Sequence, residues 1–405
     1  MDLGKSACLV FALAGCMVGD ASDVADTSPE GDPAVDDSAV AAHARSNLLR
    51  ARLQDGLDAL FSHGMVGTVG EVSDGRDRIV ARSGVARAGR PEPVAFDSRF
   101  RMGSNTKTFV AVVMLQLVEE GRVRLDDSVD HWLPGVVSGN GNDGRLVTVR
   151  NLLQHTSGIF DYTEALLATF TLADYQRMRF QSVDPEELVD VAMVHAPRFA
   201  PGAGWSYSNT NYILAGMIIK KVTGHDWSSE VRTRILAPLG MSQTFDPGDW
   251  PGLPAPHASG YQTFTDDGPL VDVTLFNHTL ADAAGALVTT TRDLTRFWRA
   301  LQRGKLLGPA AMAEMHRTID ATELQVVIPG VRYGLGILWV PARCGAGYWG
   351  HLGDTFGFST RNGVSDDGSR AVVVSQNTTP SSGAATLQFL EDDLQLVDQV
   401  MCAGR

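Results

Sequence analysis

Lysine is scarce in this chain. Only five of the 34 basic residues are lysines, at positions 5, 107, 220, 221 and 305, so the ordinary surface cation of this protein is arginine. Acidic residues outnumber basic ones by 47 to 34, which gives a formal net charge of −13. Nucleic-acid-binding surfaces are basic as a rule, so we predict no nucleic-acid partner.

Two further absences narrow the class of protein. The sequence has no run of 18 apolar residues that could cross a bilayer as a helix. Its ten histidines form no H-x-x-x-H pair and do not cluster with the four cysteines, so we predict no metal site. The 405 residues are 44% hydrophobic, which is enough to bury one large core or two lobes.

Residues 1–16 have the features of a processing signal. Lys5 precedes an apolar run from Ala7 to Leu13, and the tetrapeptide Leu13-Ala14-Gly15-Cys16 resembles the lipobox of bacterial lipoproteins. The resemblance implies cleavage before Cys16, lipidation of its thiol, and a membrane-anchored protein in the periplasm or on the cell surface. The alternative is an ordinary secretory signal that is cleaved nearby and yields a secreted protein.

Residues 17–42 differ in composition from the rest of the chain. They hold seven acidic residues, two prolines and no lysine or arginine. Such a segment cannot bury a core, so we predict an acidic disordered tether. The folded body is then expected over residues 43–405.

Hydrophobic spacing in the body predicts an α/β (α+β) fold. Leucines return at helical spacing from Leu48 to Leu60, short alternating segments follow, and strand signals return near the end of the chain. We expect an antiparallel sheet flanked by helices, built from residues 43–125 and 279–405, with an inserted, mainly helical lobe over about 126–278. The expected strands lie at 66–72, 78–81, 100–103, 335–340, 347–350, 356–364 and 370–376, and the clearest helices at 149–154, 185–195, 211–222 and 384–401.

Ser104 and Lys107 form the most informative pair in the sequence. They precede an apolar run from Val110 to Val118, which predicts a buried helix with Ser104 at its start. Positions i and i+3 share a helix face, so a hydroxyl would lie beside an amine, near the free backbone N–H groups of the first turn. A desolvated lysine can accept a proton and arginine cannot. In a chain that otherwise uses arginine, this favours a serine nucleophile with a lysine base over a capped surface helix.

Two later stretches carry further polar groups. Tyr207 and Asn209 are two residues apart in a polar loop, so an extended backbone would point them the same way. A phenol can relay a proton, and a carboxamide can hold a substrate carbonyl or orient the lysine. His351 and Gly353 stand at a late strand, where the histidine could donate to substrate and the glycine could admit its backbone. Each of these stretches alone is a weak signal.

The ordered set S-x-x-K, Y-x-N and H-x-G resembles the serine β-lactamase and penicillin-binding superfamily. The resemblance runs from about Leu48 to Cys402 and is closest to secreted serine D-alanyl-D-alanine carboxypeptidases. It implies Ser104 as the acylated nucleophile, Lys107 as its proton acceptor and Tyr207 as the proton relay, and it implies that no cofactor is needed.

The same resemblance implies the remaining site residues. Asn209, His351 and Gly353 would contact substrate. The backbone N–H groups of Ser104 and Asp354 would form the oxyanion hole.

The two cysteines that lie beyond the signal are Cys344 and Cys402. In an oxidising compartment they could pair and fasten the last helix to the sheet, and the resemblance also includes this late pair. Two free thiols remain the alternative.

The chain departs from the carboxypeptidase pattern where that pattern holds a substrate carboxylate. Leu352, Asp354 and Leu338 stand in place of two hydroxyls and an arginine. A carboxylate at Asp354 would repel another carboxylate. The reaction type is unaffected, but the carboxypeptidase substrate is put in question.

We therefore expect a monomeric serine acyl hydrolase that acts on small peptide, ester or β-lactam substrates. The leading prediction is a D-alanyl-D-alanine carboxypeptidase acting on cell-wall peptides. The alternatives are an esterase, a D-amino-acid amidase or a β-lactamase of the same family, and a penicillin-binding sensor with little turnover.

Overall fold

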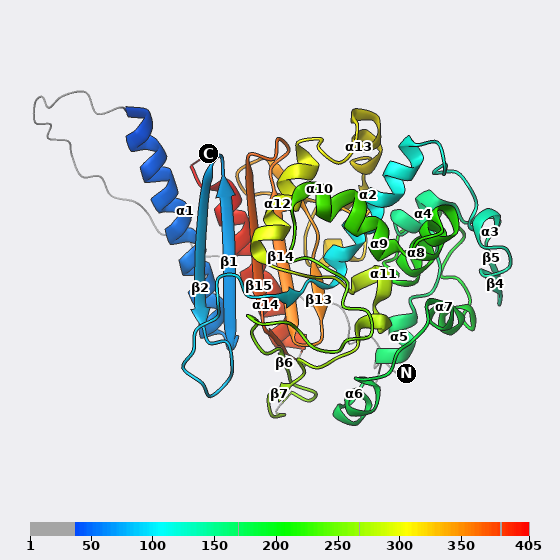
Figure 1. The fold of residues 1–405 in the computed structure, drawn as a ribbon, viewed down its shortest axis with the longest axis horizontal. Coiled ribbons are helices and arrows are strands. Elements are labelled where there is room, and N and C mark those ends of the chain that lie inside the picture. The colour runs from blue at the N-terminus through cyan, green and yellow to red at the C-terminus, as the bar shows by residue number, and fades with distance from the viewer. Residues whose placement is uncertain (1–36, 169, 267, 381–382, 405) are drawn as a thin grey trace, which may run out of the picture.

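A large antiparallel sheet forms one half of the molecule and a group of helices forms the other (Figure 1). The computed structural model describes residues 37–168, 170–266, 268–380 and 383–404. The predicted signal over 1–16 and most of the predicted tether lie outside these residues. In the described residues the sheet has nine strands. Their order is β2 (Asp77–Gly84), β1 (Gly67–Asp74), β15 (Arg370–Gln376), β14 (Phe358–Val364), β12 (Gly347–Gly350), β11 (Leu338–Pro341), β10 (Arg332–Tyr333) and β9 (Ile319–Asp320), with β13 (Gly353–Thr355) paired to β14.

Helices cover both faces of the sheet, and the alternation of side chains along β15 explains why. Val372 and Val374 pack with leucines of α1 (Asp37–Ser62) and with α14 (Gly383–Cys402). Ala371 and Val373 point the other way and pack with α12 (Thr291–Gln302). Successive strand residues face opposite sides, so a strand covered on both sides carries apolar residues on both faces, as β15 does from Ala371 to Val374.

The helical half surrounds α2 (Thr106–Glu119), whose residues from Thr106 to Leu115 are all buried. A helix that is apolar on every side belongs in the interior of a protein. Its neighbours include α8 (Thr210–Thr223) and α11 (Asp282–Gly285). The other helices are α3 (Val129–Trp132), α4 (Val149–Leu153), α5 (Tyr162–Leu167), α6 (Leu172–Met178), α7 (Pro185–Met193), α9 (Trp227–Val231), η2 (Arg232–Leu236), α10 (Ala237–Leu239), η3 (His278–Leu280), α13 (Pro309–Met315) and η4 (Leu324–Val326).

Three small sheets complete the described residues. They pair β3 (Phe100–Arg101) with β8 (Val288–Thr289), β4 (Ser138–Gly139) with β5 (Asn142–Asp143), and β16 (Thr378–Thr379) with β6 (Tyr261–Gln262) and β7 (Val271–Asp272). None of the described helices is both long and apolar enough to cross a membrane.

The predicted fold class is confirmed, and several local bounds differ. The strand predicted over 100–103 ends at Arg101, because Gly103 opens a 3₁₀ turn, and the strand predicted over 356–364 begins at Phe358. Helix α1 begins at Asp37, so residues 37–42 of the predicted tether are helical, in keeping with their alanine content. The strand predicted over 335–340 begins only at Leu338, because Gly336 has φ +73°, which is not a strand conformation. Gly336 packs closely on α2, since a Cβ added to it would lie 2.5 Å from the Ala111 Cβ. Strand β13, of three residues, was not predicted.

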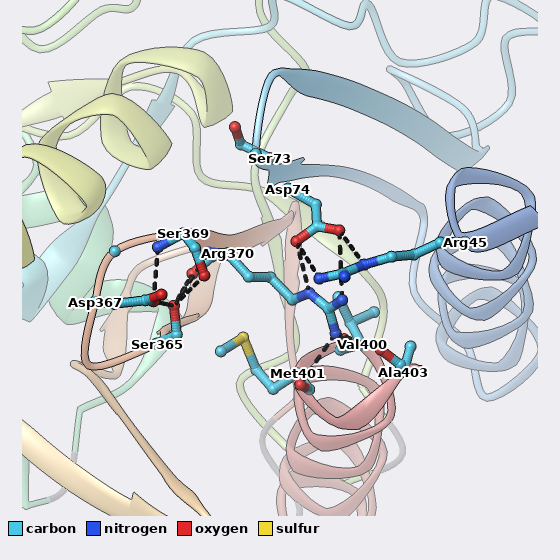
Figure 2. A network of polar contacts seen from close by, with 12 residues as sticks. Arg45, Ser73, Asp74, Ser365, Asp367, Ser369, Arg370, Val400, Met401 and Ala403 are labelled. Carbon is cyan, nitrogen blue, oxygen red and sulfur yellow. Dashed lines mark hydrogen bonds and ion pairs between the residues drawn. The ribbon is translucent and has the colours of Figure 1, made fainter. Parts of the chain in front are cut away.

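The last turn of α14 is held by a buried arginine (Figure 2). Nη1 of Arg370 donates to the carbonyls of Val400, Met401 and Ala403, at 2.9, 3.1 and 2.7 Å. Nε of Arg370 lies 3.2 Å from a carboxylate oxygen of Asp74. Carbonyls at a helix C-terminus lack partners within the helix, and here a guanidinium supplies them.

A second attachment lies at the same turn. Cys344, in the loop between β11 and β12, forms a disulfide with Cys402, 58 residues away. Asp74 also pairs with Arg45 of α1, so its carboxylate links α1 to Arg370, the residue that holds the end of α14 (Figure 2).

Candidate active site

Ser104 lies in a single 3₁₀ turn, Gly103–Asn105, that leads directly into α2. Gly103 has φ +53°, and a Cβ there would lie 2.8 Å from the backbone nitrogen of Asp354 on β13. A glycine is therefore required, because the turn and the strand touch backbone to backbone. Thr106 Oγ1 donates to the Gly103 carbonyl at 2.9 Å, and the buried side chain of Asn105 accepts from Asn362 at 2.6 Å. The turn that carries the nucleophile is thus fixed from both sides.

Lys107 is fully buried, and its Nζ has three neighbours. These are Ser104 Oγ at 3.0 Å, Asn209 Oδ1 at 2.7 Å and the Ala284 carbonyl at 2.8 Å. A neutral amine has two hydrogens and one lone pair, and the two carbonyl oxygens can only accept. They therefore take the two hydrogens, and the lone pair of a neutral Lys107 faces the Ser104 hydroxyl.

The environment of Lys107 favours this neutral form. Burial lowers the pKa of Lys107 to about 7, and the negative charge of Asp161 acts in the opposite direction. A base with a pKa near the working pH is matched to proton transfer. The structure thus places the predicted nucleophile and its predicted base in contact, with the base poised to titrate.

Tyr207 lies over the same amine. Its ring centroid is 4.9 Å from Lys107 Nζ. Burial raises the pKa of Tyr207 well above its ordinary value, although a hydrogen bond with Ser104 opposes that shift. The phenol is therefore protonated at neutral pH and can donate.

His155 supports Tyr207 from behind. The two ring centroids are 4.2 Å apart, and Nδ1 of His155 accepts from the Ser208 backbone at 3.2 Å. Burial lowers the pKa of this histidine well below its ordinary value, with the nearby charge of Lys107 adding to the shift. His155 is thus a neutral packing partner of the predicted relay. The sequence analysis assigned it no role.

Asn209 is engaged at both ends of its amide. Its Oδ1 accepts from Lys107, and its Nδ2 donates to Asp161 Oδ2 at 2.8 Å and to Thr163 Oγ1 at 3.3 Å. Of the two roles weighed from sequence, the structure displays the orientation of the lysine. Contact with a substrate amide stays a prediction.

His351 is 3% exposed, and the protein engages both of its ring nitrogens. Nδ1 lies 2.6 Å from the Leu352 carbonyl, which can only accept, so Nε2 accepts from the Tyr333 hydroxyl at 3.0 Å. Burial lowers the pKa of His351 to about 3, and Lys107 adds to the shift. His351 is therefore neutral and supports the wall of the site. Donation to substrate stays a prediction.

Gly353 is needed for a contact inside the protein. A Cβ there would lie 2.1 Å from the Met102 carbonyl and 2.5 Å from Asn105 Nδ2. The close approach expected from a substrate backbone is thus made by the segment that carries the nucleophile. This packing brings the backbone of Asp354 beside the Ser104 turn, the arrangement that the predicted oxyanion hole requires.

The Asp354 side chain lies at the surface of the site and is 56% exposed. Its Oδ1 accepts from Arg361 Nη2 at 2.9 Å and from Ser359 Oγ at 2.8 Å. Arg361 is itself 8% exposed, and its Nε lies 3.1 Å from Asp393 Oδ2 on α14. One buried guanidinium therefore serves two carboxylates.

Asp393 is 1% exposed, and burial raises its pKa to about 7 even though Arg361 acts to lower it. The sequence analysis missed both Arg361 and Asp393. The available signal, for Arg361 alone, was a single charged residue inside an otherwise uncharged strand, F-S-T-R-N-G-V. Among the residues that the structure describes, no group of three metal-binding side chains is present.

Comparison with known proteins gives consistent results. A family model described as Beta-lactamase matches residues 46–395. The structure is similar to a D-stereospecific amidohydrolase from Streptomyces sp., with 41% identity, a TM-score of 0.77, and coverage of 85% of this chain and 98% of that one. It is also similar to the D-amino acid amidase from Ochrobactrum anthropi SV3, with 30% identity, a TM-score of 0.75, and coverage of 88% and 98%.

Similarity to curated proteins covers shorter segments. Penicillin-binding protein 4* of Bacillus subtilis (strain 168) is 34% identical over 185 residues, which are 45% of this chain and 38% of that protein. The chain spans about half the length, or less, of the first curated relatives it matches, at 38% and 48%.

Proposed function

This chain belongs to the beta-lactamase family and is a serine hydrolase, and we propose that it is a D-stereospecific amidohydrolase. Its substrates would be amides or short peptides whose acyl part is a D-amino-acid residue. Two observations support the proposal. One is the likeness to the Streptomyces amidohydrolase over 85% of this chain. The other, which carries the proposal furthest, is the exposed carboxylate of Asp354 next to the nucleophile.

The leaving-group side of the site disfavours a carboxylate. Asp354 presents negative charge beside the Ser104 turn, Leu352 is half-buried there, and Leu338 is buried. An incoming carboxylate would find no hydroxyl or arginine at these three positions and would meet a like charge at one of them. A simple amide, whose leaving group is ammonia or a neutral amine, avoids that repulsion.

The proposed acylation follows from the contacts at Lys107. The neutral amine takes the Ser104 proton while Oγ attacks the carbonyl carbon, and the developing oxyanion accepts from the backbone N–H groups of Ser104 and Asp354. Tyr207 donates its proton to the departing nitrogen and is reprotonated from Lys107. In deacylation a water replaces the leaving group, its proton returns along the same route, and Ser104 Oγ is released.

The test is hydrolysis of matched substrates. D-Phenylalanine amide should be cleaved and L-phenylalanine amide much more slowly, and Ser104→Ala should remove the activity while leaving the thermal transition intact. D-Phenylalanyl-D-alanine should be a poorer substrate than its C-terminal carboxamide. The variant Asp354→Thr should narrow that difference. Equal cleavage of the free acid and the carboxamide by the wild type would refute the leaving-group argument.

The second candidate is the D-alanyl-D-alanine carboxypeptidase favoured by the sequence resemblance. Its support is the similarity to penicillin-binding protein 4* over 45% of this chain. A fluorescent penicillin separates the candidates, because long-lived labelling of Ser104 favours a carboxypeptidase or a sensor. Rapid release of the label favours a β-lactamase, and absence of labelling favours an amidase or esterase.

We also propose that the mature protein is a lipid-anchored monomer. The support is the Leu13-Ala14-Gly15-Cys16 motif. Cys16→Ser should yield unprocessed or released protein. Mass spectrometry of an unlipidated mature N-terminus beyond Cys16 would refute the anchor, and light scattering checks the monomer.

A further inference from the structure

We infer that Asp161 is a positioning residue, which holds the base Lys107 in its productive orientation by fixing the amide of Asn209. The inference rests on the role proposed above for Lys107. Asp161 belongs to none of the three motifs and precedes α5, on the opposite side of Asn209 from the nucleophile. Its carboxylate is nevertheless linked to Ser104 through two side chains.

The link is a continuous chain of short contacts. Asp161 Oδ2 accepts from Asn209 Nδ2 at 2.8 Å, Asn209 Oδ1 accepts from Lys107 at 2.7 Å, and Lys107 Nζ lies 3.0 Å from Ser104 Oγ. Asp161 is 5% exposed, so this contact is sheltered from water. Inside a protein such a chain is stronger than its members would be in solvent.

The carboxylate determines which end of the amide faces the lysine. A carboxylate can only accept, so Asn209 must turn its NH₂ group toward Asp161 and its oxygen toward Lys107. The opposite orientation would point two hydrogens at the amine and compete for its lone pair. By forbidding that orientation, Asp161 reserves the lone pair of Lys107 for the Ser104 proton.

The intervening amide also separates the two charges. An opposite charge in direct contact would hold the pKa of a lysine high and keep it protonated. Here Asp161 still raises the pKa of Lys107, but burial outweighs it. The arrangement thus gives an oriented base that can lose its proton near neutral pH.

The other titratable groups around Lys107 carry no charge at neutral pH. His155 and His351 are neutral because burial lowers the pKa of each. Tyr207 and Tyr212, whose ring centroids lie 4.9 and 5.6 Å from Nζ, are neutral because burial raises theirs. Of these described groups, Asp161 is the one whose charge can move the titration of the base.

Asp161 is itself held in place. It caps the N-terminus of α5 by accepting from the Thr163 backbone at 3.0 Å. The next residue, Tyr162, donates its backbone N–H to Thr210 Oγ1 at 3.1 Å and so fastens the segment to α8. Asparagine is an equally good cap, so Asp161→Asn removes the charge and the orientation rule but keeps the cap.

The experiment measures the rate at which a fluorophosphonate labels Ser104 between pH 5 and 9, because this probe has no titrating group in that range. The wild-type rate should rise with pH as Lys107 loses its proton (the acid limb) and then reach a plateau. For Asp161→Asn we expect the acid limb to move to lower pH by about one unit or less and the plateau rate to fall about tenfold or more. The matched control is Asp184→Asn, another helix-capping aspartate, at the start of α7. It should leave both the limb and the plateau unchanged.

Each outcome decides the inference. If Asp161→Asn folds and its acid limb stays at the wild-type pH, Asp161 does not act on the base. If it does not fold, Asp161→Glu decides, because a wild-type plateau in that charged but longer variant would contradict the positioning role. Retention of labelling by Lys107→Arg would instead overturn the proposed mechanism, so the two failures are distinguishable.

Discussion

Two buried cations flank Ser104, and they are held in opposite ways. On one side Lys107 meets its carboxylate, Asp161, only through the amide of Asn209. On the other side Arg361 contacts Asp354 and Asp393 directly, at 2.9 and 3.1 Å. In the first assembly Lys107 and Asp161 are buried and Asn209 is half-buried, whereas the second reaches the surface at Asp354.

The difference follows from what each cation can do. Arginine keeps its proton at all relevant pH values, so direct pairing with two carboxylates costs no function and fixes the strand beside the nucleophile. Lysine has to lose its proton to act as a base, and direct pairing would prevent that. An amide spacer orients the lysine without locking its charge. In a chain with only five lysines, the one placed here is the cation that can titrate.

The largest effect on the acylation rate is expected when Lys107 is replaced by arginine, the type of cation found on the other side of Ser104. Lys107→Arg keeps the charge but cannot accept the Ser104 proton, so acylation should fall by about 10²–10⁴-fold. Ser104→Ala should abolish labelling altogether, and both variants should keep the circular dichroism spectrum of the wild type. A folded Lys107→Arg protein that labels at a near wild-type rate would remove the basis of the comparison.

Removing the other cation should affect stability more than chemistry. Arg361→Met leaves buried Asp393 without its cationic partner and with only the hydrogen bond from Gln376, which should lower the free energy of unfolding by about 3–5 kcal/mol in urea titrations. The double variant Arg361→Met/Asp393→Asn should recover part of that loss, because it removes the orphaned charge. Arg145→Met, which breaks an exposed ion pair with Asp143, is the matched control and should change little. Equal losses in the two arginine variants would contradict this account of Arg361.

Removing the disulfide should destabilise the attachment of α14, on the Arg361 side of Ser104, and leave the titration of Lys107 unchanged. Replacing Cys344 and Cys402 by serine frees a loop of 58 residues and should cost roughly 4 kcal/mol in the chain-entropy model. Because α14 lies on the Arg361 side of the site, where it carries Asp393, the acid limb of labelling should stay where it is. Native protein in which both thiols react with an alkylating agent before reduction would disprove the bridge.

The smallest effect is the pH dependence of the wild type itself. The pKa of Lys107 is lowered to about 7, so labelling by the fluorophosphonate should be half-maximal near pH 7 and fall about tenfold for each unit below it. The sign follows from the chemistry, because the deprotonated amine is the active form. A rate that is flat from pH 5 to 9 would show that no group with such a pKa controls the reaction.

Around the nucleophile, the sequence predicts contacts only between residues that are close together along the chain. Ser104 and Lys107 are three residues apart, and helix geometry alone predicts their contact. The acceptor that holds Lys107 on its far side, the Ala284 carbonyl, is 177 residues away and belongs to no motif. Asp161 and Asn209 are 48 residues apart, and no pattern in either segment predicts their contact.

The sheet was predictable where alternation was long and uncertain where backbone contacts decide. Strands β12 and β15 have the predicted bounds, because each has strand-forming residues at its centre, Tyr348 and Trp349 in β12 and three valines in β15. The short β13 exists because Gly353 packs against Met102, a contact that no pattern of hydrophobic residues encodes. Arg361 could have been suspected from its place in a buried strand, but its two partners could not.

Asp74 links Arg45 of α1 to Arg370, which holds the end of α14, so the two ends of the folded body lie near each other. Gly404 lies so close to α1 that a Cβ on it would be 4.0 Å from Arg45 Cγ. A short linker between these points would therefore span little distance, and the chain could be reopened at the exposed β4–β5 hairpin, Ser138 to Gly141, away from the nucleophile. Such a circular permutant would begin and end in the helical half, yet Asp74 would still pair with Arg45 of α1 and Arg370 of β15. The order of segments along the chain is thus separable from the arrangement that positions Ser104.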